Sequence, residues 1–139
     1  MKIFNFHIRA VHAVEKKIGY RFKNPALFQK ALTHPSYRAE HKAGEDDYER
    51  LEFLGDSVLG MLTASYLYQE YPSLNEGRLT AMKTQITNGK TLADIGFSLG
   101  IGDFIKMGRG EAKSGGGQRA SNIADVVEAL LGAVYLDGG

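Results

Sequence analysis

Two segments of the sequence place carboxylates among apolar residues at helical spacing. In the first, Glu49, Glu52 and Asp56 are separated by three, four and seven positions. At about 100° per residue, these offsets put all three on one stripe of a helix, within roughly 60° of one another. Like charges at i and i+4 repel each other even in water, so the stripe needs an explanation beyond the apolar core that its neighbours predict.

Glu49 by itself has a structural explanation. Asp46 and Glu49 have the spacing of a capping box, and a carboxylate in the first turn interacts favourably with the helix dipole. Asp56 lies beyond the second turn, where the dipole no longer helps. Asp56 is therefore the stronger indication of a site.

The second segment carries Asp125 and Glu128 three positions apart, in the stretch 120–136 that is apolar almost all round. Each residue taken singly is compatible with a solvated surface position. A helix that is apolar on all sides is normally buried, however, and offers little solvated face. An unpaired buried carboxylate costs several kcal/mol, and two of them repel, so we expect a cation to neutralise them.

A divalent metal ion is the expected cation. Arg50 is the only basic side chain in either motif, and it points about 100° away from Glu49. Hard ions such as Mg²⁺ or Mn²⁺ take carboxylate and water oxygens and leave positions open for a substrate phosphate. Carboxylates on two helices with such an ion predict phosphate chemistry.

Other metals fit the sequence poorly. Zinc prefers His or Cys ligands, and the chain contains no Cys. No Glu lies three residues before any His, so the Glu-x-x-His pattern of di-iron helical bundles is absent. The histidines show no ligand spacing and are interpreted as structural or solvated: His7, His12, His34 and His41.

The elements that must position these residues are predicted to be all helical. Apolar residues with helical spacing begin with Phe4, Ile8, Val11 and Ile18. Pro25 suits a first helical turn, and Pro35 is expected to close that helix before a polar loop up to Asp47.

The acidic motifs lie on the two longest predicted helices. The first runs from Tyr48 to about Tyr71, where Pro72 ends it, and the other covers 120–136. Between them we predict a helix after Asn75, another over 88–100, and an irregular, mobile basic loop over the glycine-rich stretch 108–119. The fold class is all-α, with no β-hairpin signal and no repeat.

Composition limits the function classes. A length of 139 residues with 43% hydrophobic residues suits one domain with its own core. A net charge of +1 gives no compositional indication of a polyanionic partner. No stretch approaches the roughly 20 apolar residues of a membrane span, and His7, Arg9 and His12 interrupt any signal sequence. We expect a soluble, cytoplasmic protein without a membrane partner.

The motifs around the carboxylates resemble a known family. ERLEFLGDSVLG, over 49–60, closely resembles the signature of the ribonuclease III endonuclease domain. ALTHPSY, NEGRLT, GRGEAKSGG and NIADVVEALLGAVYLDGG stand in the family's order, so the likeness covers nearly the whole chain. It implies an all-α, homodimeric ribonuclease III endonuclease-like fold, with one catalytic domain over 1–139. Relatives of the common bacterial type continue into a double-stranded-RNA-binding domain, whereas this chain stops at LDGG.

The resemblance also implies an activity. Such domains hydrolyse phosphodiester bonds of double-stranded RNA in rRNA and mRNA processing, using Mg²⁺ for which Mn²⁺ can substitute, and leave 5′-phosphate and 3′-hydroxyl ends. The family's metal-binding carboxylates fall on Glu52, Asp56, Asp125 and Glu128, of which Asp56 and Glu128 are the positions designated catalytic.

Further positions carry over from the family or from charge. Glu49 and Glu76 match accessory acidic positions around the catalytic valley and dimer interface, and Phe53 matches an apolar residue that packs into the partner subunit, although an ordinary core aromatic is the alternative. Basic residues in and around the glycine-rich loop are candidates for holding RNA phosphates, unless they are simply solvated: Lys106, Arg109, Lys113 and Arg119.

Three rival functions remain open from the sequence. A non-catalytic RNA-binding module on the same fold is expected to lose acidic ligands, and this chain keeps all four. A helical bundle whose carboxylates serve transport or redox is disfavoured by the missing Glu-x-x-His pattern. A metal-free ribonuclease using two histidines would leave 2′,3′-cyclic phosphates instead of 5′-phosphates.

Overall fold

The computed structural model describes residues 11–41 and 46–139, and the regular structure in these residues is helical. The all-α prediction is confirmed. Extended pairing within the described ranges is limited to one parallel bridge between Thr33 and Lys106. Phe4, His7, Ile8 and Arg9 lie outside the described residues. None of the helices over 11–41 and 46–139 is both long and apolar enough to cross a membrane.

The chain enters through residues 11–18, which are helical, and α2 (Pro25–Ala31). As predicted, Pro25 lies in the first turn of a helix, where its missing N–H costs nothing. The Asn24 side chain accepts a hydrogen bond from the Ala26 N–H at 3.0 Å and caps this end.

Pro35 begins a helix instead of closing one, so the prediction of a loop directly after it was wrong. Helix α2 ends at Ala31, and Pro35 is the first residue of α3 (Pro35–Glu40). The His34 imidazole acts as its N-terminal cap, because Nδ1 accepts the Ser36 N–H at 3.0 Å. A proline fits the first turn of a helix as well as it ends one, and the cap on the preceding residue decides between the two.

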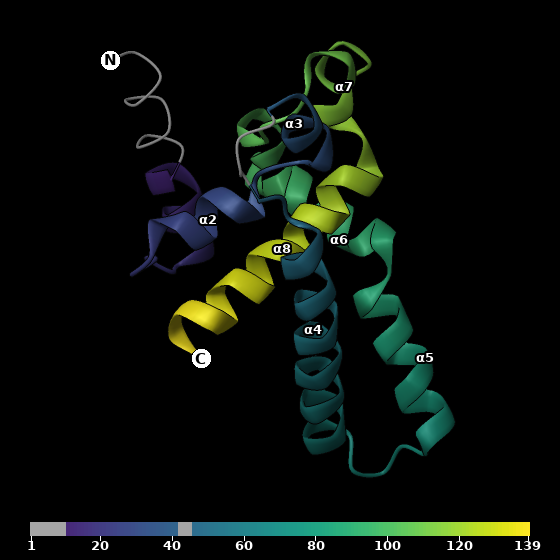
Figure 1. Ribbon diagram of the computed structural model, residues 1–139. Helices are drawn as coiled ribbons and strands as arrows, with labels where there is room; N and C mark the ends of the chain where they lie inside the picture. Colours follow the sequence, from purple (N-terminus) through teal and green to yellow (C-terminus); the bar gives the residue numbers. More distant parts are fainter. Residues whose placement is uncertain (1–10, 42–45) are drawn as a thin grey trace.

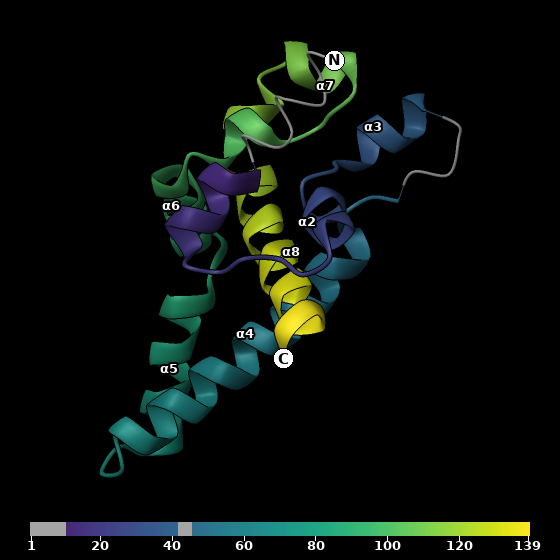
Figure 2. The same ribbon diagram turned by 90° about the vertical axis from the view of Figure 1, so that its left-hand side faces the viewer.

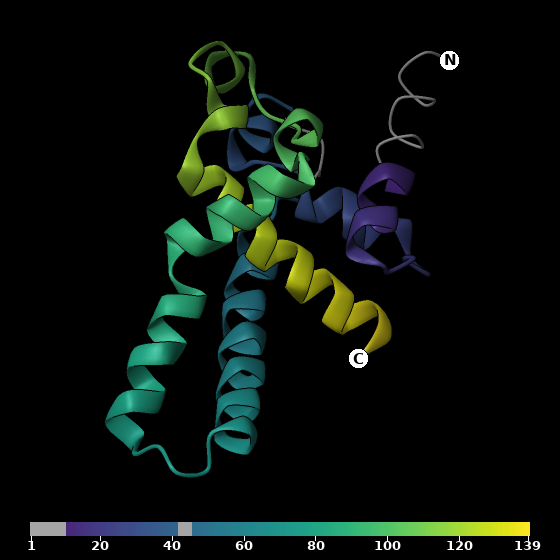
Figure 3. The same ribbon diagram turned by 180° about the vertical axis from the view of Figure 1, so that it is seen from behind.

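Helices α4 (Glu49–Glu70) and α5 (Glu76–Thr87) form an antiparallel pair that extends away from the rest of the molecule (Figures 1 and 3). The predicted break at Pro72 separates them. The Asn75 side chain accepts the Arg78 N–H at 3.0 Å and starts α5. Helix α6 (Gly89–Leu99) then runs to Gly100, whose φ of +64° ends it in the left-handed conformation that glycine adopts without strain.

The glycine-rich stretch after the 3₁₀ turn η1 (Ile101–Phe104) is more regular than predicted. It contains α7 (Arg109–Lys113) and a second 3₁₀ turn, η2 (Gly116–Gln118). Hydrogen bonds to other elements hold it: the Arg109 N–H donates to Glu40 at 2.8 Å, and Asn122 of the last helix donates to Glu111 at 3.0 Å. The prediction of an irregular loop rested on the glycine content alone, and local composition contains no information on hydrogen bonds to residues outside the stretch.

Helix α8 (Ala120–Gly138) lies at the centre and packs against α4, α6 and α2 (Figure 2). The predicted central, buried helix is confirmed. Its buried apolar side chains belong to the hydrophobic core that they share with Phe28, Leu51, Leu92 and Ile101, among others. Burial of this apolar surface is the main favourable contribution to folding.

Candidate metal site

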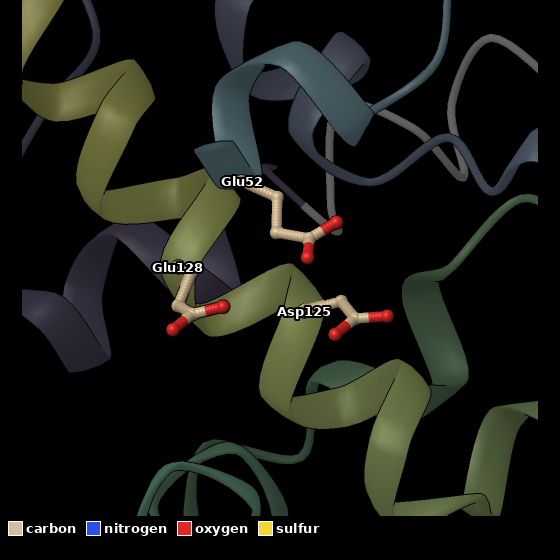
Figure 4. A group of neighbouring side chains, drawn as sticks. All are labelled: Glu52, Asp125 and Glu128. Carbon is tan, nitrogen blue, oxygen red and sulfur yellow. The ribbon is translucent and has the colours of Figure 1, made fainter. Parts of the chain in front are cut away.

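The crossing of α4 and α8 brings three carboxylates together. Glu52 projects from α4 toward Asp125 and Glu128, which project from α8 on the facing side (Figure 4). Each contributes one oxygen to a group in which all three oxygens lie within 4.8 Å of one another. All three residues are half-buried. Two segments far apart in the sequence therefore form one acidic cluster, defined here as Glu52, Asp125 and Glu128.

Two glycines make this close crossing possible. A methyl group at Gly55 of α4 would overlap the backbone carbonyl of Glu128, and one at Gly132 of α8 would overlap the carbonyl of Leu51. The backbones therefore touch where the acidic residues leave the two helices. Side chains larger than glycine at this point would separate Glu52 from Glu128.

The N-terminus of α4 is capped differently from the prediction. Tyr48 is the residue before the helix and makes no side-chain cap, while the buried Asp47 carboxylate accepts the Glu49 N–H at 3.1 Å. Asp46 instead pairs with Lys30. The capping box predicted from Asp46 and Glu49 is therefore wrong, because the helix starts three residues after Asp46 and a neighbouring carboxylate takes the capping role.

The cluster is electrostatically strained in the absence of a cation. Burial, followed by the charges of Asp56, Glu52 and Asp125, raises the pKa of Glu128 to about 7. Burial and then the Asp125 charge raise the pKa of Glu52. Burial also raises the pKa of Asp125, against the opposing effects of a hydrogen bond from Tyr48 and of the nearby His34. Both desolvation and mutual repulsion thus favour the protonated carboxyls.

No basic side chain within the described ranges forms an ion pair with the cluster. The ion pairs found there all lie elsewhere: His12–Glu15, Lys30–Asp46, Arg38–Asp47, Lys90–Asp94 and Arg119–Glu111. Three oxygen donors that form no ion pair with a basic side chain of residues 11–41 or 46–139 match the preference of hard divalent ions such as Mg²⁺ or Mn²⁺. The residues present therefore fit a divalent metal ion.

Asp56, the fourth predicted ligand, lies at the border of the cluster. It sits one helical turn after Glu52 on α4 and its side chain is exposed. It does not belong to the group of oxygens within 4.8 Å, yet its charge raises the pKa values of both Glu52 and Glu128. The structure thus brings together three of the four predicted ligands and leaves Asp56 beside them.

The two residues predicted as accessory acidic positions, Glu49 and Glu76, lie apart from each other. Glu49 is exposed in the first turn of α4, and its charge contributes to the raised pKa of Glu52. Glu76 begins α5, at the end of the α4–α5 pair that is remote from α8 (Figure 3). Within this chain Glu76 is therefore not close to the cluster.

The candidate phosphate-binding residues have different surroundings. Arg109 and Lys113 are exposed on α7. The Lys106 Nζ lies 5.7 Å from the centre of the Tyr37 ring, and the Arg119 guanidinium pairs with Glu111 at 2.5 Å. Two of the four positively charged residues, Arg109 and Lys113, are thus exposed, while Lys106 and Arg119 have partners in the described part of the chain.

One residue at the site was not predicted as functional. The Tyr48 hydroxyl donates a hydrogen bond to Oδ2 of Asp125 at 3.3 Å, and only 3% of Tyr48 is exposed. Burial and the Asp125 charge raise the pKa of this phenol. The only indication in the sequence is the position of Tyr48 directly before ERLEFLGDS, and from the sequence we interpreted Tyr48 simply as the start of a helix.

Comparison with known proteins shows which family the chain resembles. A family model described as Ribonuclease-III-like matches residues 24–139. The chain is 43% identical to Ribonuclease 3 of Carboxydothermus hydrogenoformans over 91% of its own length and 54% of the relative's. It is 48% identical to Ribonuclease 3 of Idiomarina loihiensis over 89% of its length and 52% of the relative's. The chain thus spans about half the length of these curated relatives.

Solved structures show the same fold. Two structures of the nuclease domain of ribonuclease III from Campylobacter jejuni match with TM-scores of 0.86 and 0.84 at 36% and 37% identity. They cover 93% and 92% of this chain, and 87% and 84% of the matched chains. One of them describes flexibility in a region involved in dimer formation in that protein. Together with the matching family model, these similarities show that the chain belongs to the ribonuclease-III-like family.

Proposed function

We propose that this domain is a divalent-metal-dependent endoribonuclease that hydrolyses phosphodiester bonds of double-stranded RNA and leaves 5′-phosphate and 3′-hydroxyl ends. The observation that carries the proposal is the meeting of Glu52, Asp125 and Glu128 within 4.8 Å at the α4–α8 crossing. RNA is proposed as the substrate because the chain matches the ribonuclease-III-like family. The acidic cluster is proposed as the site of the ion that such hydrolysis uses.

The chain's own residues hold and orient the reacting groups. Glu52, Asp125 and Glu128 would hold the ion through carboxylate oxygens, with Mg²⁺ preferred and Mn²⁺ as a substitute. Such an ion supplies Lewis-acid chemistry, because it activates water at neutral pH and offsets negative charge on the phosphate. The two helices fix the directions of the ligands, since their backbones touch at Gly55 and Gly132.

Asp56 is proposed as the fourth ligand, acting directly or through a water molecule, and as a catalytic residue together with Glu128. Its carboxylate is exposed, one helical turn after Glu52, and is therefore accessible to an RNA phosphate. The Asp56 charge contributes to the raised pKa values of Glu52 and Glu128. Asp56 takes part in no ion pair within residues 11–41 and 46–139. Glu49 and Glu76 are proposed as accessory acidic residues.

Duplex RNA is proposed to contact the basic residues near α7. Arg109 and Lys113 present exposed charges that suit phosphate contacts, and Lys106 and Arg119 flank them. A-form RNA is recognised mostly by shape and by phosphate and 2′-hydroxyl contacts across the minor groove. We expect such contacts to position the duplex without reading its sequence.

A homodimer is proposed from the apolar surface of α4. Phe53 is 78% exposed beside the acidic stripe, and this exposure supports a contact with a partner over the alternative of an ordinary core aromatic. Large apolar side chains that gather on an exposed helix face mark interaction sites, and Met61 and Tyr68 lie on the same side of α4 as Phe53. The other large apolar side chains exposed on α4 are Met61, Leu62, Tyr66 and Tyr68.

Incubation of the protein with end-labelled duplex RNA, with Mg²⁺ and with chelator, tests the proposed activity. We expect cleavage only with Mg²⁺, and products that carry a 5′-phosphate and a free 3′-hydroxyl. Products ending in 2′,3′-cyclic phosphate would indicate a metal-free histidine mechanism. Binding without cleavage under both conditions would favour a non-catalytic RNA-binding module.

A further inference from the structure

We propose that Tyr48 is a positioning residue, whose hydroxyl holds the Asp125 carboxylate in the orientation needed for metal binding. This inference rests on the proposed metal site and deepens it. The hydroxyl donates to Oδ2 of Asp125 at 3.3 Å, while the other carboxylate oxygen makes no such bond with Tyr48. A hydrogen bond on one oxygen limits rotation of the carboxylate and fixes where the second oxygen points.

Tyr48 also connects both ligand-bearing helices. Its backbone carbonyl accepts the Glu52 N–H at 2.8 Å, which is the first hydrogen bond of α4. Its side chain meanwhile reaches Asp125 on α8. One residue thus fixes the start of the helix that carries Glu52 and the side chain of a ligand on the other helix, so it couples the two halves of the cluster.

The surroundings of the ring prevent Tyr48 from adjusting freely. The phenol is buried, and the His34 imidazole contacts it edge to face, with ring centres 5.7 Å apart and planes at 82°. His34 is itself held by the Ser36 N–H at 3.0 Å. The Tyr48 N–H donates to the Thr33 carbonyl at 2.9 Å. Because both the backbone and the ring are fixed, the hydroxyl has a defined place next to Asp125.

The contact is better suited to orientation than to stability. At 3.3 Å it is longer than the roughly 2.7–2.8 Å typical of O–H···O bonds, so it contributes little to folding. Hydrogen-bond partners of metal ligands nevertheless tune metal affinity, and their removal typically costs about 10- to 100-fold in binding or activity. We therefore expect the loss of the hydroxyl to appear in metal affinity before it appears in folding.

The test compares Mn²⁺ binding by the wild-type protein and Tyr48→Phe, without RNA, by calorimetry and electron paramagnetic resonance. We expect about 10-fold weaker Mn²⁺ binding, an altered resonance spectrum and nearly unchanged melting in chelator. Tyr20→Phe is the matched control, because the Tyr20 hydroxyl donates to Asp137 at 2.7 Å, away from the cluster. Its Mn²⁺ affinity should equal that of the wild type.

A double-mutant cycle separates positioning from general damage. In an Asp125→Asn background, Tyr48→Phe should cause little further loss of Mn²⁺ affinity, since the hydroxyl acts through the Asp125 carboxylate. Equal Mn²⁺ affinity of wild type and Tyr48→Phe would overturn the inference, as would a Tyr48→Phe protein that fails to fold in chelator. Failure of the wild type itself to bind Mn²⁺ would instead overturn the proposed metal site.

Discussion

Gly55 of α4 lies directly against the backbone carbonyl of Glu128 in α8, with no room for a side chain between them. The same contact is repeated from the other helix, where Gly132 lies against the carbonyl of Leu51. The helices can therefore approach until their backbones touch. This contact accompanies the close approach of the Glu52 and Glu128 carboxylates, whose oxygens lie within 4.8 Å of each other in the acidic cluster.

Gly55→Ala should damage both folding and the metal site. The added methyl group meets backbone atoms, which cannot move aside as a flexible side chain would. We expect a loss of about 1–3 kcal/mol in unfolding free energy, the usual cost of overpacking, and weaker Mn²⁺ binding. Denaturant unfolding and calorimetry measure the two effects. Gly89→Ala is the control, because a methyl group there meets nothing within 4 Å and its stability should be unchanged or higher.

Asp56→Asn and Glu128→Gln should each give a folded protein that cleaves duplex RNA very slowly. Both changes keep side-chain shape but remove a charge from the proposed site. Loss of several kcal/mol of transition-state stabilisation corresponds to about 10²-fold or more in rate. Single-turnover cleavage with Mg²⁺ measures the loss, and Glu70→Gln, at the remote end of α4, serves as the control. Near wild-type cleavage by Asp56→Asn would remove that residue from the site.

Local signals in the sequence predicted most of the helices. Pro25, Asn75 and Gly100 mark helix ends through their own backbone or side-chain chemistry, and the structure has helix ends at each. Pro35 and the stretch 108–119 were misread because their structure depends on distant partners, such as Glu40 for α7. Local propensity cannot include a hydrogen bond to a residue far along the chain.

The candidate site, like the helices, was predicted where local spacing was enough and missed where it depends on tertiary packing. Helical spacing placed Asp125 and Glu128 on one side of α8, and the family resemblance linked them to Glu52. The contribution of Tyr48 could not be predicted, because its hydroxyl reaches Asp125 only through the tertiary packing of the two helices. The border position of Asp56 likewise depends on how α4 crosses α8.

Phe53→Asp should convert a dimer into a monomer. A carboxylate at this exposed apolar position would have to be desolvated in any interface that Phe53 enters, which costs several kcal/mol. Sedimentation velocity at matched concentrations measures the change. Leu136→Asp is the control, since Leu136 is 56% exposed near the end of α8 and should leave the dimer intact. A dimer that is unaffected by Phe53→Asp would exclude Phe53 from the contact.

RNA binding should be weak and should depend steeply on salt. With a net charge of +1, affinity must come from a few local phosphate contacts. Lys113→Gln is expected to weaken binding of all duplexes alike and to reduce the slope of log affinity against log salt by about 1. Titrations in chelator at several salt concentrations measure the slope. Lys16→Gln, in the exposed part of segment 11–18, should change it little, and equal slopes for all three proteins would contradict the assignment.

The raised pKa of Glu128 predicts how stability depends on pH when no metal is bound. Below its ordinary value of 4.5, Glu128 is protonated in both the folded and the unfolded chain, so it costs nothing. As pH rises from 4.5 to about 7, the unfolded chain loses the proton first, and the free energy of unfolding falls. Above about pH 7 Glu128 is ionised in both states, and the free energy of unfolding is lowered by the full cost of holding this charge in the folded protein. The contribution of Glu128 is thus greatest in acid and is lost toward neutral pH.

Glu128→Gln should therefore melt higher than the wild type in chelator at about pH 8, and the difference should vanish near pH 4. One pKa unit corresponds to about 1.4 kcal/mol, and partial exposure reduces the effect, so we expect about 1–3 kcal/mol. Added Mg²⁺ should stabilise the wild type by mass action far more than the variant. Calorimetry with chelator and with Mg²⁺ measures both differences, and Glu70→Gln should show neither. A Glu128→Gln protein that melts lower than the wild type in chelator at about pH 8 would mean that Glu128 stabilises the metal-free fold, contrary to a repulsive cluster awaiting an ion.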